Sequence, residues 1–149
     1  MSIQQDVKYD VFVSYTASEI AFVKTLVLKL ADRGLSVWFD QGQLRLGDSV
    51  LRSLEDGLEH SNYFLLIISP SFFQGPWTQF EAGVALSRVG KDHILPVYRG
   101  IDPDAIKSHA PLLADRVAIS ADQHSIDEIA DMVVEIIQDE RESKAELNP

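Results

Sequence analysis

The sequence predicts an α/β protein in which five parallel strands form one doubly wound sheet with helices on both faces. Two observations predict this class. Strand-like and helix-like patterns alternate along the chain, which is the order of elements in a parallel sheet joined by crossover helices. The third strand candidate, residues 63–68, is apolar throughout, as expected of a strand covered on both sides.

Apolar runs and capping residues mark the first two strands and the helix between them. Residues 9–14 form a short apolar strand candidate. Thr16 and Glu19 have the spacing of a capping box, so we expect them to begin a helix, which Gly34 ends as a C-terminal cap. Five apolar side chains of this helix are expected to face inward: Phe22, Val23, Leu26, Val27 and Leu30. Residues 35–39 are the predicted second strand.

The middle of the chain alternates in the same way. A loop over residues 40–47 leads to Asp48, the expected N-cap of a second helix. The inward side chains of that helix are Leu51, Leu54 and Leu58. The third strand, residues 63–68, is followed by Pro76, which suits the first position of another helix.

The last third of the chain contains two weaker strands and a long helix. Residues 93–98 are the predicted fourth strand, Asp102 begins a short helical segment, and residues 116–119 form a weak fifth strand. Ser125 and Glu128 have the spacing of a second capping box. The helix that follows is expected to turn four side chains inward: Ile129, Val133, Ile136 and Ile137.

Length and composition indicate one domain and exclude several function classes. The 149 residues suggest a single domain over residues 1–140, with a polar tail at 141–149 that we expect to fray. A net charge of −10 argues against non-specific binding to nucleic acid or an anionic membrane, because both need a basic patch. No cysteine is present, and the four histidines lack metal-ligand spacing, so we expect no metal site. The absence of a signal-peptide or membrane-spanning pattern indicates a soluble, cytoplasmic protein.

A five-stranded sheet of this kind is expected to have the flavodoxin-like order 2-1-3-4-5. Ligands of such sheets bind outside the carboxyl ends of the strands, at the switch point between the first and third strands. Residues 14–16 and 69–77 would border that crevice. Glu81 lies on the predicted helix that follows residues 69–77. It is therefore a candidate catalytic residue.

Glu81 has alternative interpretations. The helical spacing places it one turn after Trp77, on the face directed toward the protein body, but it could also pair with Arg88 or simply be solvated. Glu19 is a second candidate catalytic carboxylate, although the capping-box role accounts for it and is favoured. No Walker A or G-x-G-x-x-G pattern exists among the glycines, so the familiar phosphate-binding loops are excluded.

Three segments, taken in order, resemble the TIR (Toll/interleukin-1 receptor) domain family. Residues 9–15 look like its first-strand box. Residues 39–48 look like its second-strand box and BB loop, and residues 69–81 look like the exit of its third strand and the start of helix C. The resemblance extends from Tyr9 to about Ile137, and favours the prokaryotic, NAD-cleaving branch.

This resemblance implies a substrate and a set of site residues. In the family members that are enzymes, the glutamate at the position of Glu81 is catalytic. Their substrate is NAD+, and the bond that is cleaved joins nicotinamide to ribose. The resemblance implies no cofactor. The implied substrate-binding residues are Ser14, Tyr15, Thr16, Ala17 and Trp77.

The first loop also departs from some relatives, which carry arginines after the first-box tyrosine, where this chain has Thr16 and Ala17. The negative charge of the NAD+ diphosphate would then have to be balanced by backbone N–H groups, by Arg45 or Arg99, or by a neighbouring subunit.

The BB loop comprises Leu44, Arg45, Leu46, Gly47 and Asp48. In the family this loop joins TIR domains to one another. The resemblance therefore implies homotypic assembly, or contact with other TIR domains, and a resting form that is activated by self-association. The alternative is that the two leucines fold onto the core and Gly47 only sets a turn.

Three functions follow as hypotheses. The leading one is an NAD+ glycohydrolase or cyclase that yields ADP-ribose or a cyclic ADP-ribose, in prokaryotic antiphage defence. The second is a non-catalytic TIR scaffold, or a bacterial effector that binds host TIR adaptors through the BB loop. The third is an enzyme like the nucleoside 2-deoxyribosyltransferases, against which the BB-loop match counts.

Overall fold

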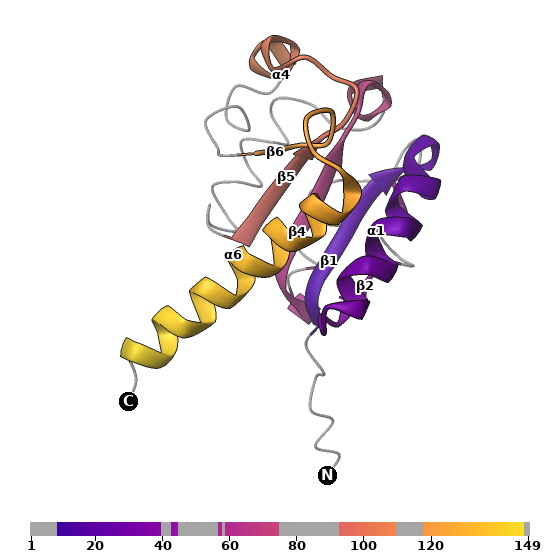
Figure 1. Ribbon diagram of the computed structural model, residues 1–149. Coiled ribbons are helices and arrows are strands. Elements are labelled where there is room, and N and C mark those ends of the chain that lie inside the picture. The colour runs from indigo at the N-terminus through magenta and orange to yellow at the C-terminus, as the bar shows by residue number, and fades with distance from the viewer. Residues whose placement is uncertain are drawn as a thin grey trace.

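The centre of the protein is a parallel β-sheet (Figure 1). The computed structural model describes residues 9–39, 43–44, 57, 59–74, 93–109 and 118–147. Across the sheet the strands are β2 (Val37–Trp38), β1 (Tyr9–Thr16), β4 (Ser61–Ile68), β5 (Ile94–Tyr98) and β6 (Ile119–Ser120). Each of these pairings is parallel. Counted as the five predicted strands, the order is 2-1-3-4-5, so the predicted fold class is confirmed.

A short sixth strand was not predicted. β3 (Gln43–Leu44) pairs in parallel with the end of β1, where Tyr15 lies opposite Gln43 and Thr16 opposite Leu44. Placing Leu44 in a loop was therefore wrong, because two residues are too few to show the alternation that marks a strand. This pairing also extends β1 two residues beyond its predicted end at Ser14.

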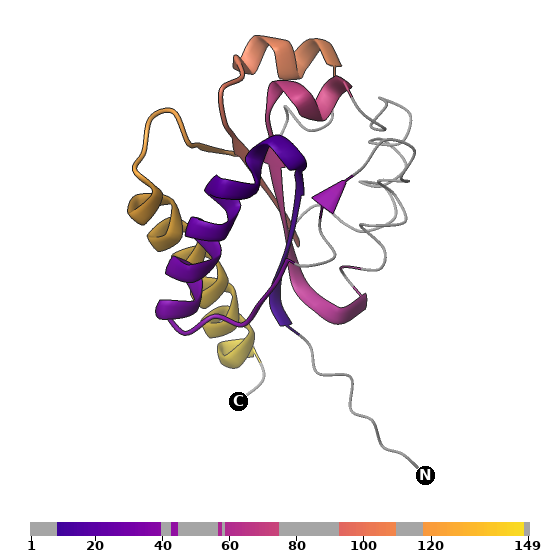
Figure 2. The same ribbon diagram turned by 90° about the vertical axis from the view of Figure 1, so that its right-hand side faces the viewer.

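Helices α1 (Ile20–Asp32) and α6 (Ile126–Leu147) lie side by side on one face of the sheet (Figures 1 and 2). Alternate strand side chains point into the core beneath them, among them Val11, Val13, Tyr15, Leu65 and Val97. Ile136 was predicted to face inward but is 37% exposed, because Val133 and Ile137 fill the inward positions of that turn.

The opposite face of the sheet has its own buried side chains. Phe12 and Phe64 are in ring contact there, with centroids 5.4 Å apart. Gly57, whose backbone is helical, lies directly against the Phe12 ring. The helices predicted to start at Asp48 and Pro76 fall largely outside the described residues.

Of the four predicted caps, two are present, one is absent, and Asp48 lies outside the described residues. Gly34 has φ +91°, and the N–H groups of Gly34 and Leu35 donate to the carbonyls of Ala31 and Leu30, which is a Schellman ending of α1. Ser125 and Glu128 form a reciprocal capping box at the start of α6, with distances of 2.9 and 3.1 Å. The capping box predicted for Thr16 and Glu19 is absent, since neither side chain caps a helix.

Helix α6 is longer than expected. Residues 141–147 continue the helix to Leu147, where the sequence pattern predicted a polar tail. Its charged residues and alanine are good helix formers, and polar composition alone did not distinguish a helix end from a tail. Within the part of the chain that the structure describes, no helix is both long and apolar enough to cross a membrane.

Among the described residues, three short helical segments lie at the carboxyl edge of the sheet, at the top of Figure 2. They are η1 (Ala17–Glu19) after β1, η2 (Pro70–Gln74) after β4 and α4 (Pro103–His109) after β5. A short helix follows Asp102 as predicted, and the Asp102 carboxylate caps it by accepting a hydrogen bond from the N–H of Asp104 at 2.8 Å. Segments far apart in the sequence therefore meet at this edge.

Candidate functional site

The predicted crevice lies where β1 and β4 end side by side. The strand order reverses at this point, since the chain goes from β1 outward to β2 and from β4 outward to β5. Ligands of doubly wound sheets bind at this switch point. Of the predicted site residues, Leu44 lies beside Thr16 in the β1–β3 pairing. Glu81, Trp77 and residues 45–48 lie outside the described residues.

The first loop, defined here as residues 16–18, lies at this edge and is partly exposed. Ser14 and Tyr15 are 0% and 2% exposed, and Thr16 is 9% exposed. Ala17 and Ser18 are exposed. Among the side chains the structure describes, the Ser14 hydroxyl finds no hydrogen-bond partner. A ligand at this edge would therefore meet Ala17 and Ser18 directly, with Ser14 and Tyr15 behind them.

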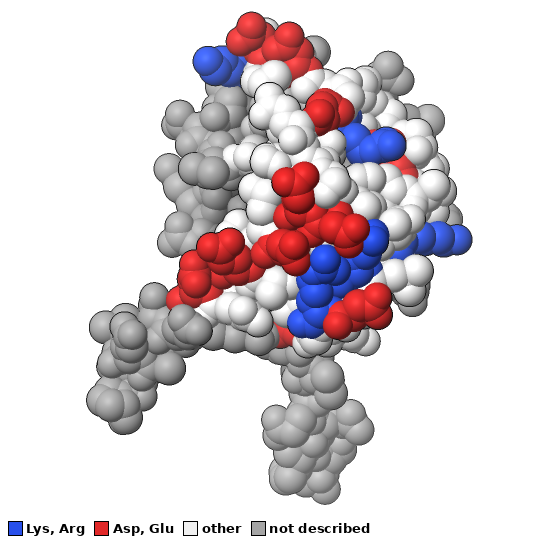
Figure 3. Space-filling model, viewed as in Figure 1, with Lys and Arg blue, Asp and Glu red and all other residues white. Residues whose placement is uncertain are grey.

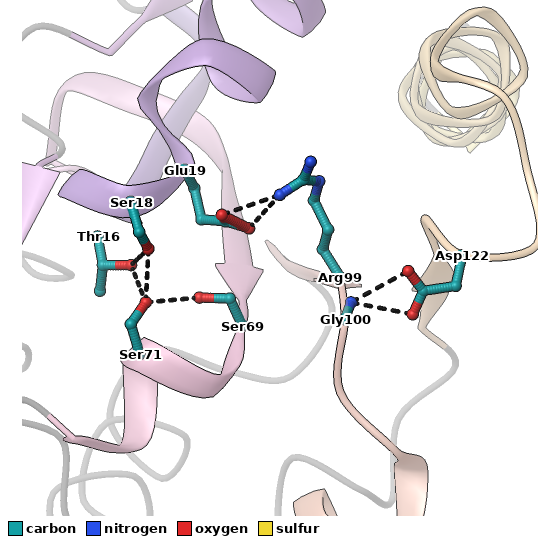
Figure 4. A network of polar contacts seen from close by, with 8 residues as sticks. All are labelled: Thr16, Ser18, Glu19, Ser69, Ser71, Arg99, Gly100 and Asp122. Atoms are coloured by element: carbon teal, nitrogen blue, oxygen red, sulfur yellow. Dashed lines mark hydrogen bonds and ion pairs between the residues drawn. The ribbon is translucent and has the colours of Figure 1, made fainter.

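Four hydroxyl groups join the first loop to the end of β4 (Figure 4). The Oγ of Ser71 lies 2.7 Å from Thr16 Oγ1, 2.7 Å from Ser18 Oγ and 2.9 Å from Ser69 Oγ. Thr16 and Ser18 are themselves 3.3 Å apart. We call Thr16, Ser18, Ser69 and Ser71 the hydroxyl cluster. A hydroxyl both donates and accepts, so such a cluster can exchange its internal bonds for bonds to sugar hydroxyls or phosphate oxygens.

An ion pair between a buried carboxylate and a half-exposed arginine holds the first loop from its other end. Glu19 has only 7% of its side chain exposed, and Arg99 Nη1 donates to both of its carboxylate oxygens at 2.9 Å (Figure 4). The Arg99 guanidinium also lies over the ring of Phe22, 4.7 Å from its centroid. Glu19 was predicted to be a cap. That role was wrong because Arg99, eighty residues away, engages both of its oxygens.

Further hydrogen bonds tie the neighbouring loops into the same edge. The backbone N–H of Arg99 donates to the carbonyl of Ile68 at 2.9 Å. The next N–H, of Gly100, donates to the carboxylate of Asp122 at 2.9 and 3.1 Å. Polar contacts therefore connect the exits of β1, β4, β5 and β6.

A surface cavity of about 660 Å³ lies beside the exits of β5 and β6. Its lining includes Tyr98, Lys107 and Asp122. Burial raises the pKa of the Tyr98 hydroxyl above its usual value. None of the site residues predicted from the sequence is among the described residues that line this cavity.

The face formed by α1 and α6 has a different character. Acidic side chains gather along α6, and basic side chains of α1 lie beside them (Figure 3). Lys29 and Arg33 pair with Asp127 and Asp131 at 2.7–3.3 Å. Exposed pairs of this kind each contribute roughly 0–1 kcal/mol. These charges largely satisfy one another.

Among the described side chains, no group of three His, Asp or Glu residues is placed to hold a metal ion. The sequence reasoning missed the Glu19–Arg99 pair and the contributions of Ser18 and Ser71. One signal could have found the pair. Arg99 directly follows an apolar strand and Glu19 closely follows another, and parallel strands end at the same edge of a sheet.

A doubly wound parallel sheet with a polar loop at its switch point defines a class of α/β domains that bind ligands at the carboxyl edge. The family model described as "TIR domain" matches residues 11–135. The chain therefore belongs to the TIR domain family, as the sequence resemblance predicted.

Relatives of known name agree with this assignment. The chain is 35% identical over 127 residues to the 2' cyclic ADP-D-ribose synthase BtTIR of Bacteroides thetaiotaomicron, which covers 83% of this chain and 44% of that protein. It is 37% identical over 134 residues to the NAD(+) hydrolase TcpA of a Theionarchaea archaeon, which covers 88% of this chain and 40% of that protein. The chain thus spans less than half the length of these relatives.

The fold is also similar to solved structures. The TIR domains in the structure of the activated Roq1 resistosome, which directly recognises the pathogen effector XopQ, superpose with a TM-score of 0.61. The match covers 86% of this chain and 98% of that one, at 17% sequence identity. At this identity, the similarity concerns the fold.

Proposed function

We propose that this chain is a TIR NAD+ glycohydrolase or cyclase that cleaves the bond between nicotinamide and ribose. The observation that carries the proposal is the similarity, at 35% and 37% identity over most of this chain, to proteins named for cyclic ADP-ribose synthesis and NAD+ hydrolysis. The polar first loop at the switch point supports it, since a dinucleotide presents hydroxyls and phosphates for such a loop to bind.

The chemistry needs few protein groups. Nicotinamide in NAD+ is a cationic pyridinium, so the C1′–N bond breaks with both electrons going to nitrogen, and nicotinamide leaves neutral. No general acid is needed for that departure, unlike most glycosidases. The remaining demand is to stabilise an oxocarbenium ion on the ribose, which a nearby carboxylate can do. Water then adds to C1′ and loses a proton, giving ADP-ribose. In a cyclase, a hydroxyl of the same molecule replaces the water.

We assign the carboxylate to Glu81 and propose that Trp77 lies close to it. Ala17 and Thr16 contact the substrate, and Ser14 and Tyr15 support them from beneath, as their burial suggests. Residues 44–48, the BB loop, are proposed to join one copy of the domain to another. The reaction needs no cofactor besides the substrate, and we expect the protein to act in the cytoplasm.

Assembly is part of the proposal. TIR domains of the same fold occur in an activated resistosome. We propose that this domain is weakly active alone and gains activity when copies associate, and that it also accepts other TIR domains. Prokaryotic antiphage defence is the proposed setting.

The test is to incubate concentrated protein with NAD+ and to follow nicotinamide and the nucleotide product by chromatography. Glu81→Gln, which keeps the size of the side chain, is expected to lower nicotinamide release by at least ~10²-fold. The matched control is Glu135→Gln, the same substitution at an exposed position on α6, with release unchanged. Both variants are first shown to be folded.

Two results would contradict the proposal. Equal release from the parent and from Glu81→Gln would remove Glu81 from the reaction. No release from the parent, even when it is crowded or tethered into assemblies, would exclude the enzyme and leave the non-catalytic scaffold.

A further inference from the structure

We propose that the Glu19–Arg99 ion pair is a positioning pair: it fixes the first loop at the substrate-binding edge and thereby sets the affinity for NAD+. This inference rests on the proposed function. It concerns two residues that the proposed chemistry does not use.

The first argument is the burial of Glu19. Its side chain is 7% exposed, whereas that of Arg99 is 42% exposed. A carboxylate taken out of water is strongly unfavourable unless it is paired. A buried ion pair adds little net stability compared with apolar side chains, but breaking it leaves an uncompensated charge. Separating the two residues is therefore unfavourable, and this favours the arrangement of the two segments in which they stay in contact.

The second argument is the side of the sheet on which each contact lies. Val11, Val13 and Tyr15 point toward α1 and α6. Side chains alternate along a strand, so Thr16 points the opposite way. Val97 also faces α1 and α6, and Arg99, two residues later, continues on that side and lies over Phe22 of α1. The ion pair thus holds the loop from the helix side and Thr16 holds it from the other.

The third argument concerns the exposed residues Ala17 and Ser18, which lie between the hydroxyl contacts of Thr16 and the ion pair of Glu19. Ala17 and Ser18 are the exposed residues of the loop, with Thr16 on one side and Glu19 on the other, both buried. The hydroxyl cluster fixes Thr16 and Ser18 to the exit of β4. Arg99, whose own N–H bonds to Ile68, fixes Glu19 to the same strand. Both ends of the exposed segment are therefore anchored to segments that follow the neighbouring strands, η2 after β4 and Arg99 after β5.

The same geometry decides how Arg99 acts. The sequence left it open as a cation for the substrate diphosphate. In the structure its charge is balanced by Glu19, and it extends on the α1 side of the sheet, away from Thr16. Arg99 therefore acts through Glu19 and the first loop rather than on the substrate.

The experiment compares steady-state NAD+ kinetics of the full chain with those of three variants and a control. Glu19→Gln removes the buried charge, and Arg99→Met removes its partner. Arg99→Lys keeps one donor, and a single nitrogen, Nη1, makes both bonds to Glu19. The matched control is Arg33→Gln, which breaks an ion pair with Asp131 at the other end of α1.

We expect Glu19→Gln and Arg99→Met to raise KM for NAD+ about tenfold while kcat changes less than about threefold, because the loop binds the ground and transition states alike. The Arg99→Lys variant should keep a KM for NAD+ within about threefold of that of the parent. Arg33→Gln should leave both constants unchanged. An arginine that touches the substrate would instead be poorly replaced by lysine, because the planar fork is lost.

Hydrogen exchange of the peptide containing residues 16–19 gives a readout that does not depend on turnover. Faster exchange in Glu19→Gln, with the residues of α6 unchanged, supports the proposal. Unchanged exchange, or unchanged KM in folded Glu19→Gln, overturns it. If neither Glu19→Gln nor Arg99→Met folds, the pair is required for the fold itself and the proposal also fails. If the parent releases no nicotinamide, the proposed function is refuted. In that case the hydrogen-exchange measurement still tests whether the ion pair fixes the first loop.

Discussion

Replacing Gly57 with alanine should destabilise this protein, although alanine is the better helix former. Gly57 has a helical backbone, and a Cβ atom there would lie 2.6 Å from Cδ1 and 2.8 Å from Cγ of Phe12. Carbon atoms in favourable contact are roughly 3.5–4.0 Å apart. The Phe12 ring cannot easily withdraw, because it is 2% exposed and its centroid lies 4.9 Å from that of Trp38 and 5.4 Å from that of Phe64.

The size of the effect is the difference between two terms. Alanine in place of glycine stabilises a helix interior by about 1 kcal/mol. Forcing an extra methyl group into a packed core costs about 1–3 kcal/mol. The distances from the added Cβ to the Phe12 ring carbons are far below contact distance, so the cost should fall in the upper part of that range. We expect a net loss of about 1–2 kcal/mol, and each 1 kcal/mol lowers Tm by roughly 2–4 °C for a domain of this size.

Urea unfolding and calorimetry of the parent and the Gly57→Ala variant measure this loss. The control is the same substitution in a Phe12→Leu background, where the smaller side chain makes room for the methyl group. There Gly57→Ala should be neutral or stabilising, so the double-mutant cycle should show a coupling of at least about 1 kcal/mol. A Gly57→Ala variant as stable as the parent, with no coupling to Phe12, would refute the packing argument.

Two further predictions concern the hydroxyl cluster and the second capping box. Ser71→Ala removes three hydroxyl contacts of 2.7–2.9 Å and should lower kcat/KM for NAD+ several-fold, with little change in Tm; an unchanged kcat/KM would show that the loop does not need the cluster. The pKa of Glu128 lies below its usual value because the backbone N–H of Ser125 donates to its carboxylate. The resulting stability is present above the ordinary pKa of glutamate and is lost as pH falls through the lowered one. Glu128→Gln should therefore lose less stability than the parent between about pH 6 and about pH 3 in thermal unfolding, and equal losses would contradict this.

The sheet could be predicted because each main strand leaves a local signal. Residues 63–68 are apolar at every position, and they lie in β4, which is buried along almost its whole length. The Ser125–Glu128 capping box was predictable for the same reason, since both partners lie within one helical turn. β3 was not predictable, because Gln43 and Leu44 have no pattern of their own and are ordered by pairing with Tyr15 and Thr16.

The candidate site was harder to predict because its contacts are long-range. Thr16 and Glu19 have the spacing of a capping box, and local rules offered no reason to reject it. Glu19 does not cap the helix because it pairs with Arg99 instead. The Arg99 guanidinium, which follows another strand, lies 2.9 Å from the Glu19 carboxylate. The Thr16 hydroxyl is likewise taken by Ser71 rather than by a helix N–H. Tertiary partners displaced both halves of a local motif.

The two sets of contacts at the first loop differ in how readily they can change. The hydroxyl cluster consists of neutral groups that each donate and accept, so a bound sugar or phosphate can replace one internal bond without leaving an unpaired group. The Glu19–Arg99 pair cannot open in this way, because separating it leaves a carboxylate that is 7% exposed without its counter-ion. If the loop binds the substrate as proposed, the cluster is the part that adapts to it, and the ion pair is the fixed point against which it adapts. A loop without arginines can in this way be rigid at one end and responsive at the other.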